Sequence, residues 1–233
     1  MSYLKVLRAK AGYGRKKVIE GLNFQAEKGK ITLVVGPNGS GKSTLAMIIA
    51  GLLRLSEGSI LLNGEDITHL VAEERARRGI SLVPERRHLF SEMSVKENLL
   101  MGGIYLPTLQ VEKEIKKVYR LFPVLKMRTH QIAGTLSGGE QQMLTIARAL
   151  ICNPEVLILD EPCRGISYKL IEKILRVLLY LKEKGTTIIL IEQNAEVMEI
   201  ADYAYAMQVG RVIARGKPQK VLSQKNIKTL FFE

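Results

Sequence analysis

A glycine-rich segment near the start of the chain limits its possible folds more than any other feature. An apolar run at residues 31–35 precedes it, and a helix-like apolar run at residues 45–50 follows it. The segment consists of Gly36, Pro37, Asn38, Gly39, Ser40, Gly41, Lys42, Ser43 and Thr44. It is the full pattern G-x-x-x-x-G-K-[ST], set between a strand and a helix, which indicates a phosphate-binding loop. The less favoured alternative is a glycine-rich turn that binds nothing.

The residue types in this loop indicate how a phosphate chain is held. Glycines allow backbone conformations that a side chain forbids, so successive N–H groups can point inward at a polyphosphate. The start of the following helix adds positive potential. We expect Lys42 to neutralise the β- and γ-phosphates and the Ser43 hydroxyl to ligate Mg²⁺. The loop therefore predicts a nucleoside triphosphate as ligand.

Two carboxylates, Asp160 and Glu161, follow the continuously apolar run at residues 156–159. An aspartate at the end of a buried parallel strand lies where the sheet meets its ligand, so Asp160 is placed to hold Mg²⁺. Glu161 would then point at the γ-phosphate and act as the general base for the attacking water. The alternative, a pair of carboxylates at a solvated strand end, is disfavoured because the phosphate-binding loop is present.

A second glycine pair occurs at residues 136–142, which read Leu-Ser-Gly-Gly-Glu-Gln-Gln. Ser137 and Glu140 fit the S-x-x-E capping box, so the simplest interpretation is a well-capped helix. That interpretation leaves Gly138 and Gly139 unexplained, because glycines cost helix stability unless a ligand must approach the backbone closely. The segment is therefore a candidate second anion site, although one nucleotide does not obviously need two.

The order of apolar runs indicates an α/β fold. Strand-like runs at residues 80–83, 156–159 and 186–191 alternate with helix-like runs, which predicts a mostly parallel sheet with its ligand at the carboxyl edge. Residues 59–64 end in Asn-Gly and predict a strand of a small antiparallel sheet. Tyr13 is expected in a loop between strands at residues 4–10 and 18–25. Short helices at about residues 95–130 predict an inserted helical part.

Composition narrows the class of protein further. The 233 residues suffice for a single sizeable core, and two cysteines without metal-type spacing suggest a reducing compartment. No signal peptide or membrane span is expected, so the protein should be cytosolic or peripheral on the cytosolic side. The net charge of +12 is dispersed, with few interleaved aromatics. This favours a solvated face for anionic lipid or an acidic partner over nucleic acid.

The three motifs, in this order, resemble those of the nucleotide-binding subunit of ABC (ATP-binding cassette) proteins. The resemblance covers essentially the whole chain. It implies a P-loop NTPase fold that binds ATP and Mg²⁺, with a small antiparallel β-subdomain and an inserted α-helical subdomain at about residues 91–134 of a single domain spanning residues 1–233. It also implies a head-to-tail dimer in which Ser137, Gly138 and Gly139 of one cassette serve the γ-phosphate held by the other.

Three more positions acquire roles through this resemblance. Tyr13 matches the aromatic residue that stacks on adenine. Glu85 stands where most cassettes have a glutamine that senses Mg²⁺ and the attacking water, so it joins Ser43 and Asp160 as a candidate metal contact. Gln193 stands where most have a histidine that contacts the γ-phosphate, and it joins Glu161 and Lys42 as a candidate catalytic residue.

Glu85 and Gln193, which differ from the residues of most cassettes, point to a subfamily. Residues 83–90, 95–103, 136–144 and 191–195 are similar to the LivF-type ATPases of branched-chain amino acid importers, in which glutamate and glutamine are usual at these positions. A further departure lies at residues 163–167, which read Cys-Arg-Gly-Ile-Ser where the subfamily tends to read Ser-Leu-Gly-Leu-Ala. In the family this loop crosses the dimer interface, so the charged Arg164 raises the question of partner choice or catalytic competence.

The resemblance implies an ATP-hydrolysing subunit of an ABC importer for branched-chain or related amino acids. Its expected partners are a second cassette, either a sister or a second copy, transmembrane permease subunits and, indirectly, a solute-binding protein. It would lie at the cytoplasmic face of the membrane. An alternative is an ABC ATPase acting on nucleic acid or ribosomes, but repair types need a long insertion, and only 95 residues separate Lys42 from Ser137. A non-hydrolysing regulatory cassette is disfavoured because Lys42, Asp160 and Glu161 are all present.

Overall fold

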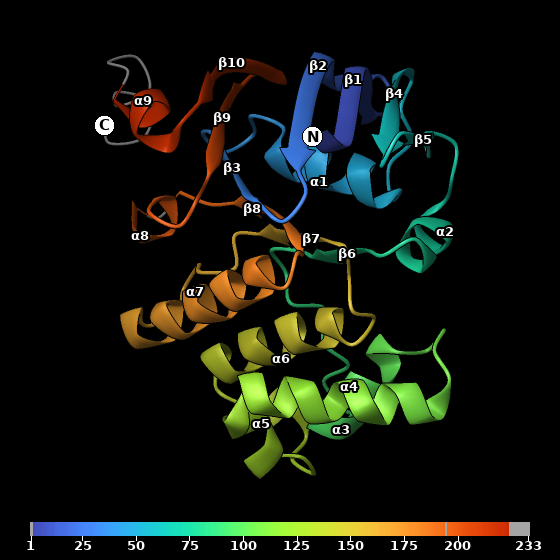
Figure 1. Ribbon diagram of the computed structural model, residues 1–233, viewed down its shortest axis with the longest axis vertical. Coiled ribbons are helices and arrows are strands. Elements are labelled where there is room, and N and C mark those ends of the chain that lie inside the picture. The colour runs from blue at the N-terminus through green and yellow to red at the C-terminus, as the bar shows by residue number, and fades with distance from the viewer. Residues whose placement is uncertain (1, 194, 224–233) are drawn as a thin grey trace.

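The computed structural model describes residues 2–193 and 195–223, so Met1, Asn194 and residues 224–233 lie outside the description. The chain forms three layers (Figure 1). An antiparallel sheet and helix α1 cover one face of a central sheet, and most of the remaining helices cover the other face.

The central sheet has six strands in the order β10-β9-β3-β8-β7-β6. All neighbouring pairs are parallel except β9 and β10, which form a hairpin. Its strands are β3 (Ile31–Val35), β6 (Ile80–Val83), β7 (Val156–Asp160), β8 (Thr187–Ile191), β9 (Tyr203–Gln208) and β10 (Arg211–Gly216). Every residue of β3, β7 and β8 is buried, as expected where both faces of a parallel sheet are covered. The predicted mostly parallel sheet is confirmed.

The smaller sheet is antiparallel and has the strand order β2-β1-β4-β5. Its strands are β1 (Ser2–Tyr13), β2 (Lys16–Glu27), β4 (Glu57–Leu62) and β5 (Glu65–Asp66). The predicted Asn-Gly turn joins β4 to β5, with positive φ at both Asn63 and Gly64. The prediction that Tyr13 lies in a loop is wrong. Tyr13 pairs with Lys16, so the ladder continues to the last residue before a tight turn.

The helices are α1 (Lys42–Ala50), α2 (Ala72–Arg77), α3 (Val95–Gly102), α4 (Thr108–Leu121), α5 (Pro123–Met127), α6 (Gly138–Leu150), α7 (Tyr168–Glu183), α8 (Ala195–Met198) and α9 (Pro218–Leu222), with a 3₁₀ turn, η1, at Ala133–Thr135. Helix α1 ends at Ala50 because Gly51 adopts a left-handed conformation and its N–H caps the carbonyls of Ile48 and Met47. Helix α4 starts directly after Pro107.

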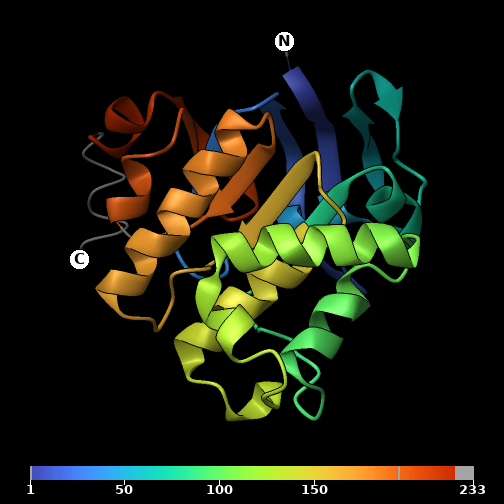
Figure 2. The ribbon, with the colours of Figure 1, turned by 60° about the horizontal axis from the view of Figure 1, so that its bottom comes forward.

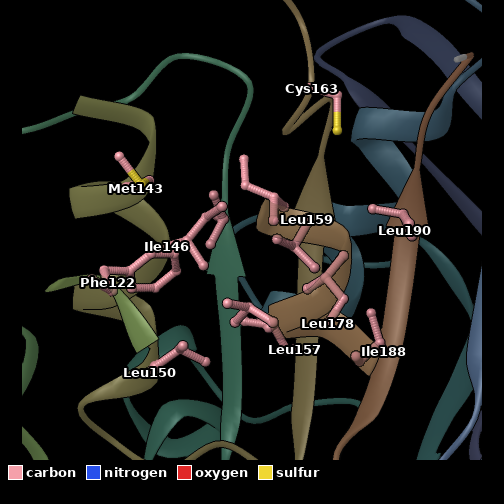
Figure 3. Close-up of a cluster of buried hydrophobic side chains, with 14 of the residues drawn as sticks. Phe122, Met143, Ile146, Leu150, Leu157, Leu159, Cys163, Leu178, Ile188 and Leu190 are labelled. Atoms are coloured by element: carbon pink, nitrogen blue, oxygen red, sulfur yellow. The ribbon is translucent and has the colours of Figure 1, made fainter. Parts of the chain in front are cut away.

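Alternate residues of the parallel strands face two separate cores. Leu157 and Leu159 of β7 pack toward the helices, together with Ile188 and Leu190 of β8. In the view of Figure 3, Leu157 and Leu159 lie between Met143, Ile146 and Leu150 of α6 on one side and Ile188 and Leu190 on the other, with Cys163 just beyond the end of β7. The residues between them, such as Ile158 and Ile189, pack instead with α1 and the antiparallel sheet. Figure 2 shows α4 lying across α6 on the outer side of the helical layer.

One basic residue departs from the expectation of a solvated basic face. Arg75 of α2 is 2% exposed, and its guanidinium donates to the carbonyl oxygens of Ile48, Ile49, Leu70 and Thr68 at 2.6–3.0 Å. Ile48 and Ile49 lie in the last turn of α1, whose carbonyls lack partners within the helix. Arg75 therefore closes the end of the helix whose start lies at the phosphate-binding loop. Among the described residues, no helix is long and apolar enough to cross a bilayer.

Candidate active site

The strand register brings four strand ends to one edge of the central sheet. Val83 pairs with Leu159, Asp160 pairs with Ile191, and Val34 pairs with the same Ile191. The residues that follow β3, β6, β7 and β8 therefore emerge side by side. The phosphate-binding loop, Glu85, Glu161 and Gln193 all follow one of these strands, which explains why residues far apart in the chain form one site.

The loop between β3 and α1 needs its glycines for two physical reasons. Gly39 and Gly41 have φ values of 78° and 100°, which side chains rarely adopt. At Gly36, a Cβ atom would lie 2.4 Å from the carbonyl oxygen of Met207, which leaves no space for a side chain. The N–H of Gly210 donates to the Ser40 carbonyl at 2.9 Å and anchors the loop to the β9–β10 hairpin. The loop is therefore fixed in place against the hairpin.

Lys42 is 4% exposed, and its side chain folds back over the loop. Its Nζ donates to the carbonyl oxygens of Gly36 at 2.7 Å and Pro37 at 3.1 Å. Burial lowers the pKa of Lys42, and the negative charges of Glu161, Asp160 and Glu85 oppose that shift. The ammonium group is thus held inside the loop and close to three carboxylates.

Asp160 is the last residue of β7 and is 5% exposed. Burial raises the pKa of its carboxyl group, while a hydrogen bond with the Ser43 side chain opposes the shift. Asp160 Oδ1 and Ser40 Oγ are buried and have no hydrogen-bond partner in the described part of the chain. A buried oxygen without a partner is costly, so each is open to a ligand. Asp160 and Ser43 therefore provide oxygen atoms of the kind that Mg²⁺ prefers.

The described part of the chain contains no complete protein cage for a metal. Among the described residues, no group of three or more His, Cys, Asp or Glu side chains could hold a metal ion. This agrees with the usual binding of Mg²⁺ by one or two protein oxygens together with water and substrate phosphates.

Glu161 has a φ of 48°, in the left-handed region that residues other than glycine rarely adopt. Its N–H donates to the carbonyl of Ile191 at 2.9 Å, which fixes the turn after β7 against the end of β8. The Gln193 Nε2 atom lies 3.4 Å from Glu161 Oε1 and 3.4 Å from Asn38 Oδ1. Gln193 therefore links the candidate base to the phosphate-binding loop.

Glu192 is a site residue that the sequence analysis did not identify. It is 5% exposed, and its carboxylate accepts the backbone N–H groups of Cys163 at 2.7 Å and Gln193 at 3.0 Å. One side chain thus joins the two loops that carry Glu161 and Gln193. The available signal was a carboxylate directly after the apolar strand at residues 187–191.

Glu85 and Arg164 form a contact that sequence spacing did not predict. Arg164 Nη1 pairs closely with Glu85 Oε1 and lies 3.1 Å from Glu161 Oε2. Glu85 follows β6 and Arg164 follows β7, which are neighbouring strands. Arg164, in the segment at residues 163–167 that differs from the subfamily pattern, therefore belongs to the same cluster as Glu161.

Tyr13 and residues 137–139 do not share hydrogen bonds with this cluster among the described residues. The exposed Tyr13 hydroxyl lies 3.2 Å from Met47 Sδ on α1, so its ring is close to the helix that begins at the loop. Ser137 caps α6 in the predicted capping box, with its Oγ accepting the N–H of Glu140. A Cβ at Gly139 would lie 2.2 Å from a Leu170 methyl group, which gives this glycine a packing reason as well.

Comparison with known proteins agrees with this geometry. The chain is 38% identical to a branched-chain amino acid transport ATP-binding protein, BraG, of Pseudomonas aeruginosa, over 94% of each chain. It is also 38% identical to a probable protein of the same kind, LivF, of Archaeoglobus fulgidus, over 97% of each chain. The crystal structure of the ADP conformation of an ATP-binding cassette is 32% identical, with a TM-score of 0.90 over 99% of this chain and 98% of the other.

The comparisons also confirm the family suggested by the sequence. The family model for ABC transporters matches residues 19–164, a range that includes the phosphate-binding loop, residues 137–139 and both carboxylates that follow the apolar strand. Because the model matches more than half of the chain and the relatives align along nearly all of it, the chain belongs to the ABC transporter family, as one of its ATP-binding cassettes.

Proposed function

We propose that this chain is the ATP-binding and ATP-hydrolysing subunit of an ABC importer for branched-chain or related amino acids. The observation that carries the proposal is one cluster at the carboxyl edge of the sheet. It combines a buried lysine in a phosphate-binding loop, a buried aspartate with a free oxygen, and a glutamate held beside both. The names of the relatives supply the solute class.

Nucleotide binding is assigned to the loop and its neighbours. The N–H groups from Gly36 to Thr44 would bind the phosphates, and Lys42 would exchange its carbonyl contacts for phosphate oxygens. Tyr13 would stack on the adenine. Ser43 and Asp160, with Glu85 at the rim, would hold Mg²⁺, which would neutralise phosphate charge when bound.

Hydrolysis is assigned to the two residues at the ends of β7 and β8. Glu161 would accept a proton from the attacking water, because its carboxylate lies next to the loop and is only partly exposed. The Gln193 amide would donate a hydrogen bond to the γ-phosphate. An amide does not become cationic, so this contact is independent of pH, unlike that of a histidine.

The second half of the site would come from another cassette. Ser137 and Gly138 are exposed at the start of α6, and among the described residues they make no hydrogen bond to the cluster around Glu161. We therefore assign residues Ser137, Gly138 and Gly139 to the γ-phosphate of a head-to-tail partner, either a sister cassette or a second copy.

A surface groove of about 390 Å³ between the core and the helical part supports a permease contact. Its lining includes Leu52, Phe90 and Met101, and Leu52 and Phe90 are 62% and 43% exposed. Large exposed apolar side chains gathered in one groove are typical of an interaction site. In this proposal the chain is a single domain over residues 1–233. Its helical subdomain, about residues 91–134, passes the ATP-driven motion to permease subunits at the cytoplasmic face, and a solute-binding protein delivers the solute.

Purification of the tagged chain from its native membranes tests this proposal. We expect permease subunits and a second cassette to co-purify with the chain. ATP hydrolysis by this complex should be stimulated by a solute-loaded binding protein. Leu52→Asp should reduce permease recovery without reducing nucleotide binding, because it places a charge in the apolar groove. Recovery with ribosomes or nucleic acid and without a permease would contradict the proposal.

A further inference from the structure

The turn after β7 carries a cation that the proposed mechanism does not use. Arg164 stands where the subfamily that the chain resembles tends to have leucine, and it places a positive charge three residues after the candidate base. The Arg164 side chain is 60% exposed, yet carboxylates from two different strand ends hold it in place.

The contacts of Arg164 complete the surroundings of Glu161. Nη1 of Arg164 lies 3.1 Å from Oε2 of Glu161, while Nε2 of Gln193 lies 3.4 Å from Oε1. Each of the two carboxylate oxygens therefore has a partner of its own. The backbone N–H of Arg164 also donates to the Glu161 carbonyl at 3.2 Å, which closes the backbone turn between the two residues.

Arg164 also offsets part of the negative charge that gathers around the site. Three carboxylates, from Asp160, Glu161 and Glu85, lie close enough to Lys42 to interact with its charge. Nucleotide phosphates would add more negative charge at the same place. Because Arg164 pairs with both Glu85 and Glu161, it offsets the charge that a glutamate brings to a position where most cassettes have a neutral glutamine.

We propose that Arg164 is a positioning residue for hydrolysis, which holds Glu161 toward the attacking water and keeps Glu85 from repelling it. This inference deepens the proposed function and rests on it. Because the side-chain ion pairs of Arg164 are with Glu85 and Glu161, its removal should act on turnover more than on nucleotide affinity.

Both ion pairs are made by the single nitrogen Nη1, so a planar fork is not required. Lysine has one nitrogen with three donors and can replace this contact, whereas glutamine brings no charge. We expect Arg164→Ala and Arg164→Gln to lower kcat about tenfold with KM for MgATP within about twofold of wild type. Arg164→Lys should return kcat to within about threefold of wild type.

A double-mutant comparison tests whether Arg164 acts by neutralising the charge of Glu85. In wild type, Glu85→Gln removes one partner of Arg164 together with the carboxylate assigned to the rim of the Mg²⁺ site, so it should lower kcat. In the Arg164→Ala background the same change also removes an unpaired charge beside Glu161, so its cost in kcat should be several-fold smaller than in wild type. Arg77→Ala is the matched control, because Arg77 is 59% exposed and lies 3.0 Å from a single glutamate, Glu73, on α2.

The assay is steady-state ATP hydrolysis by the complex purified from membranes, with nucleotide affinity measured separately. If wild type hydrolyses ATP and Arg164→Ala has the same kcat, the role of Arg164 is refuted and the proposed function is not. Loss of activity in Arg164→Lys equal to that in Arg164→Ala would do the same, since the charge would then not matter. A wild type that hydrolyses no more ATP than Glu161→Gln would instead refute the proposed function, and the inference with it.

Discussion

Replacing Arg75 with alanine tests whether a buried arginine stabilises the helix that carries the phosphate-binding loop. The change removes four hydrogen bonds, of which those to the carbonyls of Ile48 and Ile49 are fully buried. The two others, to Leu70 and Thr68, are partly buried, and water can replace them. The Ile48 carbonyl keeps the N–H of Gly51 as a donor, whereas the Ile49 carbonyl loses its donor. A buried carbonyl left without a donor costs about 1–3 kcal/mol, so we expect a loss of about 2 kcal/mol. For a chain of this length that corresponds to a fall in Tm of about 4–8 °C.

The assay is urea unfolding together with a thermal scan of the full chain without nucleotide. Arg75→Met is the informative second variant, because it keeps most of the side-chain volume but cannot donate a hydrogen bond, and it should be nearly as unstable as Arg75→Ala. Arg78→Ala is the matched control, since Arg78 makes an exposed pair with Glu65 and should change stability by less than about 0.5 kcal/mol. A Tm for Arg75→Ala within about 1 °C of wild type would refute this reasoning.

Two further predictions concern the loop and the first strand. Lys42→Ala should weaken ATP binding roughly 10- to 100-fold, because a phosphate loses a charge-assisted contact, and titration with a fluorescent ATP analogue measures it; an unchanged affinity would exclude the assigned role. Burial and the hydrogen bond to the Glu155 carboxylate raise the pKa of Tyr3 to about 12. The neutral phenol is thus favoured in the folded state, and its contribution is complete below pH 10 and is lost as the pH rises through about 12. Tyr3→Phe should therefore cost about 1 kcal/mol at pH 8 in urea unfolding, with a difference that shrinks toward pH 12, and a pH-independent difference would count against this contact.

The features that sequence predicted well depend on neighbours in the chain. The phosphate-binding loop is contiguous, so its glycines, Lys42 and Ser43 are recognisable without tertiary information. The same holds for the Ser137 capping box and for the Asn-Gly turn after β4, both of which the structure confirms. The order of apolar runs also predicted the mostly parallel sheet.

The features that sequence missed depend on strand register or on packing between distant elements. Arg75 looks like a surface residue within a basic run, and only the end of α1 packed against α2 shows why it is buried. Arg164 and Glu85 are 79 residues apart and meet because β6 and β7 are neighbours. Glu192 is recognisable as a link between loops only when the ends of β7 and β8 are known to be adjacent.

The central claim is that Glu161 activates water for hydrolysis of ATP bound at this loop. The most direct measurement compares wild type and Glu161→Gln in the membrane-derived complex for both ATP affinity and turnover. Since a general base contributes about 10²–10⁴-fold, the variant should keep wild-type ATP affinity, lose at least about 100-fold in kcat and accumulate as a closed dimer with ATP. A variant that hydrolyses ATP at close to the wild-type rate would contradict the account.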